Sequence, residues 1–318
     1  MKFLGARAGR VLKALSDVSS YRVLWYCLTD RLIPLSDGAV GQGPSGEFGI
    51  PGDLEVADTS QIPQIVFQTW KSHHTMPDNY RYWRRSFTIT NPNFRCLLWD
   101  DDDNRRFIDE RFPWFRSRYD TYPREIFRAD IIRLFFLYVY GGFYADMDSE
   151  CLRPLDGLRM TGDVLVGQMG YDQAFEHSIP NAIMASKPGQ AFWLLAIALV
   201  AERLAEFVRT NRDARPEWLT GPVLLKDAVD LYRGQSAEEI RGRILTALPE
   251  LELELSKSQF GKLVILPPPL WYPVNWNNFI HTILRKRMFT QNAVVPRATA
   301  MKLFPACFVV TYWTASWK

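Results

Sequence analysis

Hydrophobic residues along this chain occur either in short continuous runs or in longer segments that repeat with the period of a helix. The short runs predict buried strands over residues 65–67, 95–99, 143–145, 164–166, 264–266 and 308–310. The periodic segments predict helices from Asp78, from about Asn104, over residues 124–140 and over residues 191–209. Because strands and helices alternate, we expect an α/β fold in which helices cover both faces of a sheet.

The clearest helix is predicted over residues 124–140. Its apolar face comprises Ile126, Phe127, Ile131, Leu134, Phe135, Leu137 and Tyr138. Gly141 and Gly142 follow, and glycine readily adopts the left-handed backbone that ends a helix. The strand predicted over residues 143–145 comes next and stops at Asp146. The chain therefore places a carboxylate directly at the end of a buried strand.

The first 60 residues differ in pattern from the rest of the chain. Residues 1–35 predict helix, and residues 36–60 are rich in Gly, Pro and small polar residues, which favours a linker or surface loop. We expect a helical extension with a linker over residues 1–60 and one large domain over residues 61–318. Later in the chain, Glu252 and Glu254 predict the polar side of a strand or loop.

The N-terminal segment bears on location. No apolar run approaches the roughly 20 residues that a membrane-spanning helix needs. Four basic residues interrupt the N-terminal apolar stretch, which argues against a signal peptide: Lys2, Arg7, Arg10 and Lys13. Their spacing favours a basic amphipathic helix, which either lies on an anionic membrane surface or packs on the protein itself. We expect a cytoplasmic or peripheral membrane protein.

Composition changes this picture only in part. A chain of 318 residues with 47% hydrophobic residues can bury a large core, and its 11 Trp and 13 Tyr include the ring types that line sugar and base pockets. A net charge of +3 gives no general argument for a nucleic-acid partner. The four cysteines lack zinc-like spacing and are interpreted as reduced, mostly buried thiols, although four could form two disulfides.

Candidate chemistry concentrates at the end of the strand at residues 143–145. Ligands of α/β sheets bind beyond the carboxyl ends of strands, and side chains two apart in a strand point the same way. Asp146 and Asp148 can therefore face one Mg²⁺ or Mn²⁺ ion, which would neutralise a diphosphate leaving group. Asp130 and Arg133 lie three apart on the preceding helix, so both can reach a sugar held there.

These motifs resemble those of the DXD-containing glycosyltransferases of family 32, which include yeast-type initiating α-1,6-mannosyltransferases and inositol-phosphoceramide mannosyltransferases. The matching stretches are residues 62–71, 113–115, 128–133, 141–148, 181–186, 220–222 and 316–317. The resemblance implies a GT-A fold, which is a Rossmann-like mixed sheet flanked by helices, with a catalytic domain over residues 61–318. It also implies a divalent metal, a nucleotide-sugar donor and retention of anomeric configuration.

The resemblance assigns roles to individual residues. Asp130, Arg133 and Asp146 would be catalytic, and Asp146 and Asp148 would bind the metal. The donor would be bound by Gln68, Trp70, Tyr144, Asp146, Asn181, Ser316 and Trp317. GDP-mannose is the favoured donor, with UDP-hexoses as alternatives, and the acceptor would be a glycan, a glycolipid or a small molecule. Without an anchor, we expect the Golgi lumen to be the less favoured location.

One departure and several alternatives remain at this point. Many relatives carry a His shortly before the terminal Ser-Trp, whereas residues 310–317 contain none, so the third protein ligand of the metal is unassigned. The alternatives are a catalytically weak sugar-nucleotide-binding protein on the same scaffold and a D-x-D phosphatase. In the transferase hypothesis, the metal and Arg133 stabilise charge on the departing nucleoside diphosphate.

Other charged side chains favour structural roles. Residues 100–103 are four aspartates, which we interpret as an exposed turn that caps the next helix. His73 and His74 favour solvated loop positions over phosphate contact, and His177 is a candidate for the acceptor side. Residues 285–287 (Arg-Lys-Arg) favour a solvated, charged helix face over a surface that meets a lipid-linked acceptor.

Overall fold

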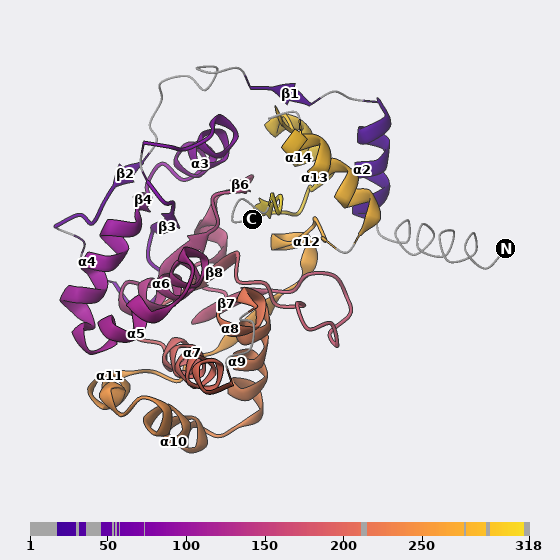
Figure 1. Ribbon diagram of the computed structural model, residues 1–318. Helices are drawn as coiled ribbons and strands as arrows, with labels where there is room; N and C mark the ends of the chain where they lie inside the picture. Colours follow the sequence, from indigo (N-terminus) through magenta and orange to yellow (C-terminus); the bar gives the residue numbers. More distant parts are fainter. Residues whose placement is uncertain are drawn as a thin grey trace.

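The computed structural model describes residues 18–29, 32–35, 46–52, 54, 56, 58–72, 74–210, 215–276, 278–290 and 293–314. The basic helix predicted within residues 1–17 lies outside these residues, as do His73, Ser316 and Trp317. Within them, the chain forms a mixed sheet with helices on both faces, as the sequence predicted (Figure 1).

The central sheet has seven strands, of which only β8 runs against the others. In spatial order they are β2 (Glu47–Phe48), β4 (Arg95–Trp99), β3 (Ile65–Thr69), β5 (Gly142–Ala145), β8 (Ile183–Ser186), β7 (Val164–Gly167) and β9 (Leu263–Leu266). The predicted strands at residues 65–67, 95–99, 143–145, 164–166 and 264–266 are all confirmed here. Because β3 and β5 are parallel neighbours, their carboxyl ends meet at one edge, next to Asp146.

Alternate residues of the buried strands enter two different cores. Phe67 and Tyr144 belong to one hydrophobic cluster, while their neighbours Val66 and Phe143 belong to another on the opposite face. All four side chains are at most 2% exposed. Strands buried on both faces are continuously apolar in sequence. The alternation of their side chains between the two clusters is therefore not visible in the sequence.

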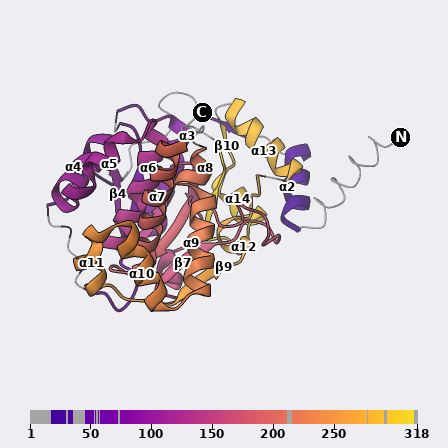
Figure 2. The same ribbon diagram turned by 60° about the horizontal axis from the view of Figure 1, so that its bottom comes forward.

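Helices account for most of the remaining described chain. They are α2 (Val18–Thr29), α3 (Asp78–Thr90), α4 (Asp101–Arg111), α5 (Arg116–Thr121), α6 (Glu125–Val139), α7 (Ala191–Thr210), α8 (Pro216–Leu219), α9 (Pro222–Gly234), α10 (Ala237–Ala247), α11 (Glu252–Lys257), α12 (Pro268–Trp271), α13 (Phe279–Thr290) and α14 (Arg297–Leu303). Short 3-10 helices lie at Pro113–Phe115, Leu155–Leu158 and Pro249–Leu251. In Figure 2, α7, α9 and α10 lie side by side in front of the sheet.

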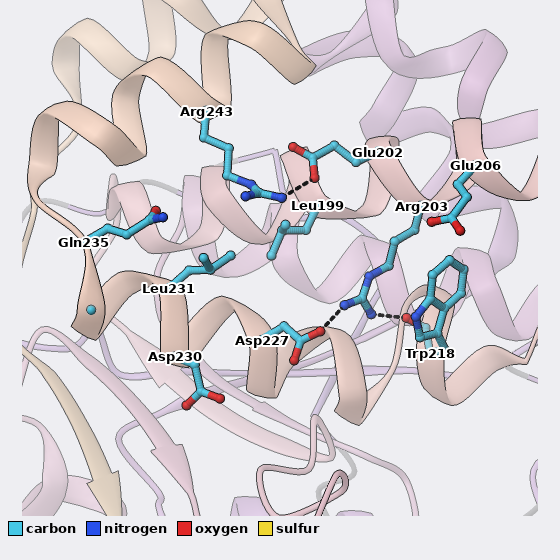
Figure 3. A pocket seen from close by; sticks show the side chains of 11 residues that line it. Leu199, Glu202, Arg203, Glu206, Trp218, Asp227, Asp230, Leu231, Gln235 and Arg243 are labelled. Carbon is cyan, nitrogen blue, oxygen red and sulfur yellow. Dashed lines mark hydrogen bonds and ion pairs between the residues drawn. The ribbon is translucent and has the colours of Figure 1, made fainter.

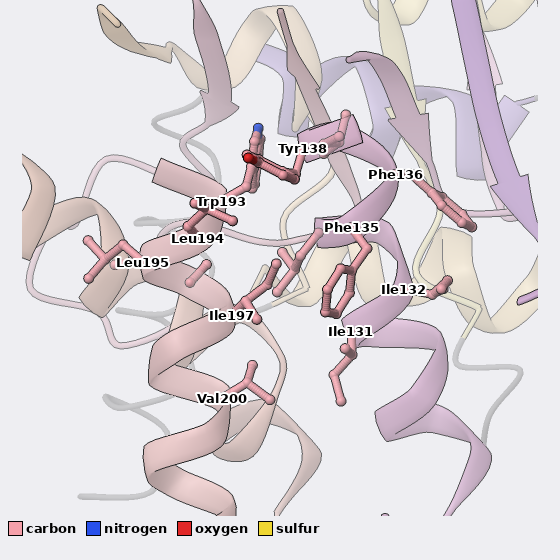
Figure 4. Close-up of a cluster of buried hydrophobic side chains, with 14 of the residues drawn as sticks. Ile131, Ile132, Phe135, Phe136, Tyr138, Trp193, Leu194, Leu195, Ile197 and Val200 are labelled. Atoms are coloured by element: carbon pink, nitrogen blue, oxygen red, sulfur yellow. The ribbon is translucent and has the colours of Figure 1, made fainter. Parts of the chain in front are cut away.

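The packing of α6 on α7 fixes the helix that carries Asp130. Ile131 and Phe135 of α6 face Ile197 and Val200 of α7 (Figure 4), and all four side chains are fully buried. Burying a large apolar side chain contributes about 1.5–3 kcal/mol. The helix ends where predicted, because Gly141 (φ +65°) donates its N–H to the Leu137 carbonyl at 3.1 Å.

A smaller two-stranded sheet brings the C-terminal segment to the site. β6 (Ser149–Cys151) pairs antiparallel with β11 (Val309–Thr311). The predicted strand at residues 308–310 is therefore confirmed, shifted by one residue, but it pairs outside the central sheet. Because β6 follows directly after Asp148, this pairing places the residues after Thr311 beside the D-x-D segment.

Three details differ from the sequence-based expectations. Glu252 and Glu254 lie in a helix, α11, instead of a strand or loop; the register of LELEL allowed both interpretations. The helix expected from about Asn104 begins at Asp101, because the Asp100 side chain caps it. Residues expected to be helical or linker contain short strands: β1 (Ile33–Pro34) pairs with β10 (Ala293–Val294), and β2 joins the central sheet.

Candidate active site

A cavity of about 710 Å³ opens beyond the carboxyl ends of β3 and β5. Among the predicted site residues, its walls include Trp70, Asp130, Arg133, Tyr144, Asp146, Asp148 and Asn181. Helix α6, strand β5 and the segment before β8 each contribute side chains. The structure therefore brings most of the residues predicted from the motif to one hollow.

Arg133 holds two carboxylates together at the floor of this cavity. Its Nη2 lies 2.8 Å from Oδ1 of Asp130, and its Nη1 lies 3.1 Å from Oδ1 of Asp146. Its Nη1 also donates to the Asn181 carbonyl at 2.8 Å, and its Nε donates to the Ala129 carbonyl at 3.1 Å. Only 4% of the Arg133 side chain is exposed. Four of its five N–H donors are thus directed at protein acceptors.

Asp130 is held by side chains from distant parts of the sequence. Asn181 donates its amide to Oδ1 at 3.0 Å, and Thr220 donates its hydroxyl to Oδ2 at 2.9 Å. Burial raises the pKa of Asp130, while the charge of Arg133 and these two hydrogen bonds oppose the increase. Thr220 had no assigned role in the sequence analysis, although it begins one of the matching stretches.

Asp146 faces the cavity from the end of β5. The Tyr144 hydroxyl donates to Asp146 Oδ1 at 2.8 Å, and the Arg133 guanidinium lies over the Tyr144 ring at 4.5 Å from its centre. Burial raises the pKa of Asp146 to about 7, the charge of Asp148 adds to this effect, and Arg133 counteracts it. About a third of the side chain remains open to the cavity (32% exposed). This carboxylate can therefore meet a ligand.

Asp148 is held by the C-terminal segment instead of by a cation. Its Oδ2 accepts the Thr314 N–H at 2.7 Å and the Thr314 hydroxyl at 3.1 Å, and its Oδ1 accepts the Thr311 hydroxyl at 3.2 Å. These three hydrogen bonds fix the orientation of the carboxylate. Neither threonine could be predicted from the sequence, because strand pairing alone brings them here.

The two carboxylates fit a divalent ion that takes most of its ligands elsewhere. Asp146 and Asp148 come from one turn of chain and face one cavity. Among the described residues, no group of three or more His, Cys, Asp or Glu could hold a metal. Mg²⁺ is commonly bound through one or two carboxylates together with phosphates and water. The donor set therefore suits a metal that arrives with a diphosphate.

Two further predicted donor-binding residues lie differently. The Trp70 ring is half-buried, lines the cavity and packs on Tyr80 with a centroid distance of 4.9 Å. Gln68 is 1% exposed and lies behind the cavity wall, where its amide is 3.5 Å from the Asp146 carbonyl. Gln68 therefore supports the D-x-D turn from behind, whereas Trp70 can contact a ligand.

The predictions for the other charged and histidine side chains have mixed outcomes. Asp100 accepts the N–H groups of Asp102 and Asp103 at 3.1 Å each, so the predicted capping role is confirmed. His177 lines the cavity, in agreement with its candidate role, and His74 is exposed. The expectation for residue 285 was wrong: Arg285 lines the cavity because α13 packs against the C-terminal segment instead of facing solvent.

A second cavity, of about 650 Å³, lies among α7, α9 and α10 (Figure 3). Its walls carry the ion pairs Arg203–Asp227 and Arg243–Glu202, the latter at 2.6 Å. Most of its charged side chains are thus paired with one another. None of the site residues predicted from the sequence lines it.

Comparisons with known proteins agree with the motif. Residues 77–165 match the family model described as "Glycosyltransferase sugar-binding region containing DXD motif". Inositol phosphoceramide mannosyltransferase 3 of Schizosaccharomyces pombe is 42% identical over 61% of this chain and 52% of its own length. Mannosyl phosphorylinositol ceramide synthase SUR1 of Saccharomyces cerevisiae is 34% identical over 43% and 34%, respectively.

More distant similarities extend the set. The initiation-specific alpha-1,6-mannosyltransferase of Saccharomyces cerevisiae is 29% identical over 34% of this chain and 23% of its own length. Among solved structures, the PaToxG glycosyltransferase superposes with a TM-score of 0.37 and 18% identity, covering 62% of this chain and 77% of that one. The family resemblance is confirmed, while the chain spans about half the length of the curated relatives that it matches.

The comparisons also correct the expected location. The relatives are yeast mannosyltransferases of Golgi type, so the expectation of a cytoplasmic or peripheral membrane protein is contradicted. That expectation rested on the lack of an apolar run long enough to span a membrane, and such a lack does not determine location. In the described part of the chain, no helix has the length and apolar character needed to span a bilayer.

Proposed function

We propose that this chain, a relative of the DXD glycosyltransferases, is a hexosyltransferase that moves a sugar from a nucleotide-sugar donor to an acceptor hydroxyl. One observation carries the proposal above all: the buried Asp130–Arg133–Asp146 cluster lies at the end of β5, beside Asp148 and an open cavity. Carboxylates held rigidly at a strand end are suited to bind sugar hydroxyls. A surface D-x-D without catalytic use would not need this buried support.

Mannose is the first candidate for the transferred sugar, and GDP-mannose for the donor. The relatives named mannosyltransferases support this choice. UDP-linked glucose, galactose or N-acetylglucosamine are the alternatives. Among acceptors, a glycolipid is favoured over a glycan or small molecule, because the curated relative with 42% identity is named for inositol phosphoceramide.

A divalent ion, Mn²⁺ or Mg²⁺, would be held by Asp148 and Asp146. When bound, it would supply positive charge to the diphosphate as the glycosidic bond breaks. The hydrogen bonds from Thr311 and Thr314 hold the Asp148 carboxylate in one orientation. With few protein ligands, the ion would bind weakly without nucleotide, so metal and nucleotide should bind together.

The described residues would then position the donor sugar. Asp130 and Asp146 would accept hydrogen bonds from its hydroxyls, and Asn181 would face the same sugar. Arg133 would act as a positioning residue, because four of its five N–H donors already bind protein acceptors. The acceptor hydroxyl would attack the anomeric carbon from the face that the diphosphate leaves, which retains the anomeric configuration. We assign this chemistry to the domain at residues 61–318.

Thermal unfolding with nucleotides tests the proposal. Ligands that bind the native state raise the melting temperature. A ligand at 100 times its Kd increases the free energy of unfolding by about 2.7 kcal/mol. We expect GDP or UDP, and the matching sugar nucleotide, to raise it only with Mn²⁺. Asp148→Asn should remove the metal-dependent part.

Assays of turnover separate the alternatives, because a catalytically weak sugar-nucleotide-binding protein would give the same shifts without transferring a sugar. No shift with any nucleotide would overturn the proposal and favour a degenerate scaffold without donor binding. Release of phosphate from simple phosphate esters, without sugar transfer, would favour the phosphatase. Lys302→Gln, a change at an exposed position of α14, is the matched control and should leave every shift unchanged.

A further inference from the structure

Arg285 reaches the cavity from α13, outside the segment that matches the family model. Its Nη2 and Nε both donate to the Trp313 carbonyl, at 2.7 Å and 3.1 Å. No ion pair to a described carboxylate satisfies its charge. A guanidinium held by one neutral carbonyl and turned towards a cavity is a ready site for an anion.

Asp148 and Arg285 face this space without pairing with each other. The charge of Asp148 acts on Arg285 and partly offsets the burial that lowers the pKa of the guanidinium. Yet each side chain is bonded to the C-terminal segment: Asp148 to Thr314, and Arg285 to Trp313. The C-terminal segment thus holds the two opposite charges apart. This leaves room for a cation beside Asp148 and for an anion beside Arg285.

The backbone conformation at Trp313 holds Asp148 and Arg285 in these positions. Its φ of 52° lies in the left-handed region, where a bulky residue is rarely found, and such strain persists only where surrounding contacts impose it. The Trp313 Nε1 donates to the Val274 carbonyl at 2.7 Å, and its ring stacks on Tyr272. This conformation turns one carbonyl to Arg285 and the next N–H to Asp148.

We propose that Arg285 binds the diphosphate of the nucleotide-sugar donor and of the departing nucleoside diphosphate. This inference rests on the proposed function and assigns a residue that neither the motif nor the relatives' names indicate. As the bond from the anomeric carbon to the phosphate oxygen breaks, its electron pair stays on the phosphate. The acceptor oxygen bonds to that carbon, and its proton passes to the diphosphate. Arg285 stabilises the added phosphate charge.

Arg133, by contrast, is too fully engaged to serve this purpose. Its guanidinium contacts Asp130, Asp146 and two carbonyls, and it is 4% exposed. The stabilisation of the leaving group that the sequence analysis gave to Arg133 is thus transferred to Arg285. Arg133 would order the sugar-binding carboxylates, and Arg285 would bind the phosphates.

Calorimetry on the full chain in 1 mM Mn²⁺ tests the inference. It measures the binding of GDP and UDP, of the corresponding monophosphates and of the free nucleosides. A hydrogen bond to a charged group contributes about 1.5–3 kcal/mol, which is about 10- to 100-fold in affinity. We expect Arg285→Gln to lose this factor for the diphosphate, less for the monophosphate and nothing for the nucleoside. Arg285→Lys should recover part of the loss, since it keeps the charge.

Controls keep this result apart from simple damage to the fold. Lys286→Gln, at the exposed neighbouring position, should bind every nucleotide as the wild type does. Equal loss for diphosphate, monophosphate and nucleoside would mean that Arg285 only supports Trp313, and would overturn the inference. Unchanged diphosphate binding in Arg285→Gln would overturn it as well. Failure of the wild type to bind any nucleotide would instead refute the proposed function.

Discussion

Asn181 donates its side-chain amide to Asp130 at 3.0 Å, although 51 positions separate the two residues along the chain. This bond ties the segment before β8 to helix α6. It also orients one of the two carboxylates that face the cavity floor. The arrangement gives the site a rigid part, centred on Arg133, and a part that depends on the C-terminal segment, centred on Asp148.

Removing the charge of Asp130 should damage both stability and function. In Asp130→Ala, Arg133 loses one of its two carboxylate partners while it remains buried. Breaking a buried ion pair in this way costs about 3–5 kcal/mol. Urea unfolding should show a loss of this size. Thr220→Val, which removes one hydrogen bond to the same carboxylate, should cost about 1–3 kcal/mol. Equal losses would contradict the account.

Metal binding should depend on pH through Asp146. Its pKa is raised to about 7, chiefly by burial, so the carboxylate carries a proton at lower pH. Because a ligand must lose its proton to bind metal, the Mn²⁺ affinity measured by electron paramagnetic resonance should fall as pH drops below about 7. Tyr144→Phe removes a hydrogen bond that lowers this pKa, so the fall should begin at higher pH. A flat profile would contradict the role of Asp146.

Glu150 should make the fold less stable as pH rises. Burial raises its pKa to about 7 from an ordinary value of 4.5. Between these two values the folded chain holds a proton that the unfolded chain has lost, so the stability from this group is full below pH 4.5 and is lost by about pH 7. Glu150→Gln removes the titration but leaves an acceptor for the Tyr312 hydroxyl.

The measurement is the melting temperature of both proteins from pH 5 to 8. The advantage of Glu150→Gln over the wild type should grow across this range, by on the order of 3 kcal/mol in stability. A constant difference would show that Glu150 titrates normally in the folded chain.

The α6–α7 contact should be essential for the position of the site. Phe135→Ala leaves a cavity in the buried cluster beside α7, where the wild-type ring also packs on Phe112 and Phe115. Such changes cost about 3–5 kcal/mol. Denaturant unfolding should show this loss, whereas Phe135→Leu should cost much less. If both variants unfold like the wild type, the contact does not hold α6 in place.

The sequence predicted the local parts of this account. The i,i+3 spacing of Asp130 and Arg133 placed them on one helix face, and the apolar run before Asp146 placed that carboxylate at a strand end. The left-handed helix end at Gly141 followed from residue type alone. Each of these depends on neighbours in the chain, which periodicity and turn chemistry describe.

The contacts between distant segments could not be predicted in the same way. Thr220 reaches Asp130 across 90 positions, and Thr314 reaches Asp148 across 166. Arg285 lies in a stretch whose charges suited a solvated surface. Only the packing of α13 against the Trp313 segment turns its guanidinium into the cavity.

The most direct test of the central claim follows GDP-mannose and the UDP-hexoses by proton NMR with the full chain, Mn²⁺ and inositol-phosphate-containing or glycan acceptors. We predict loss of one sugar nucleotide, release of its nucleoside diphosphate and a new anomeric signal with the configuration of the donor. Chelation or Asp146→Asn should abolish this change. Full turnover by Asp146→Asn, or sugar nucleotides that stay intact with every acceptor in excess Mn²⁺, would contradict the assignment of this site as a glycosyltransferase centre.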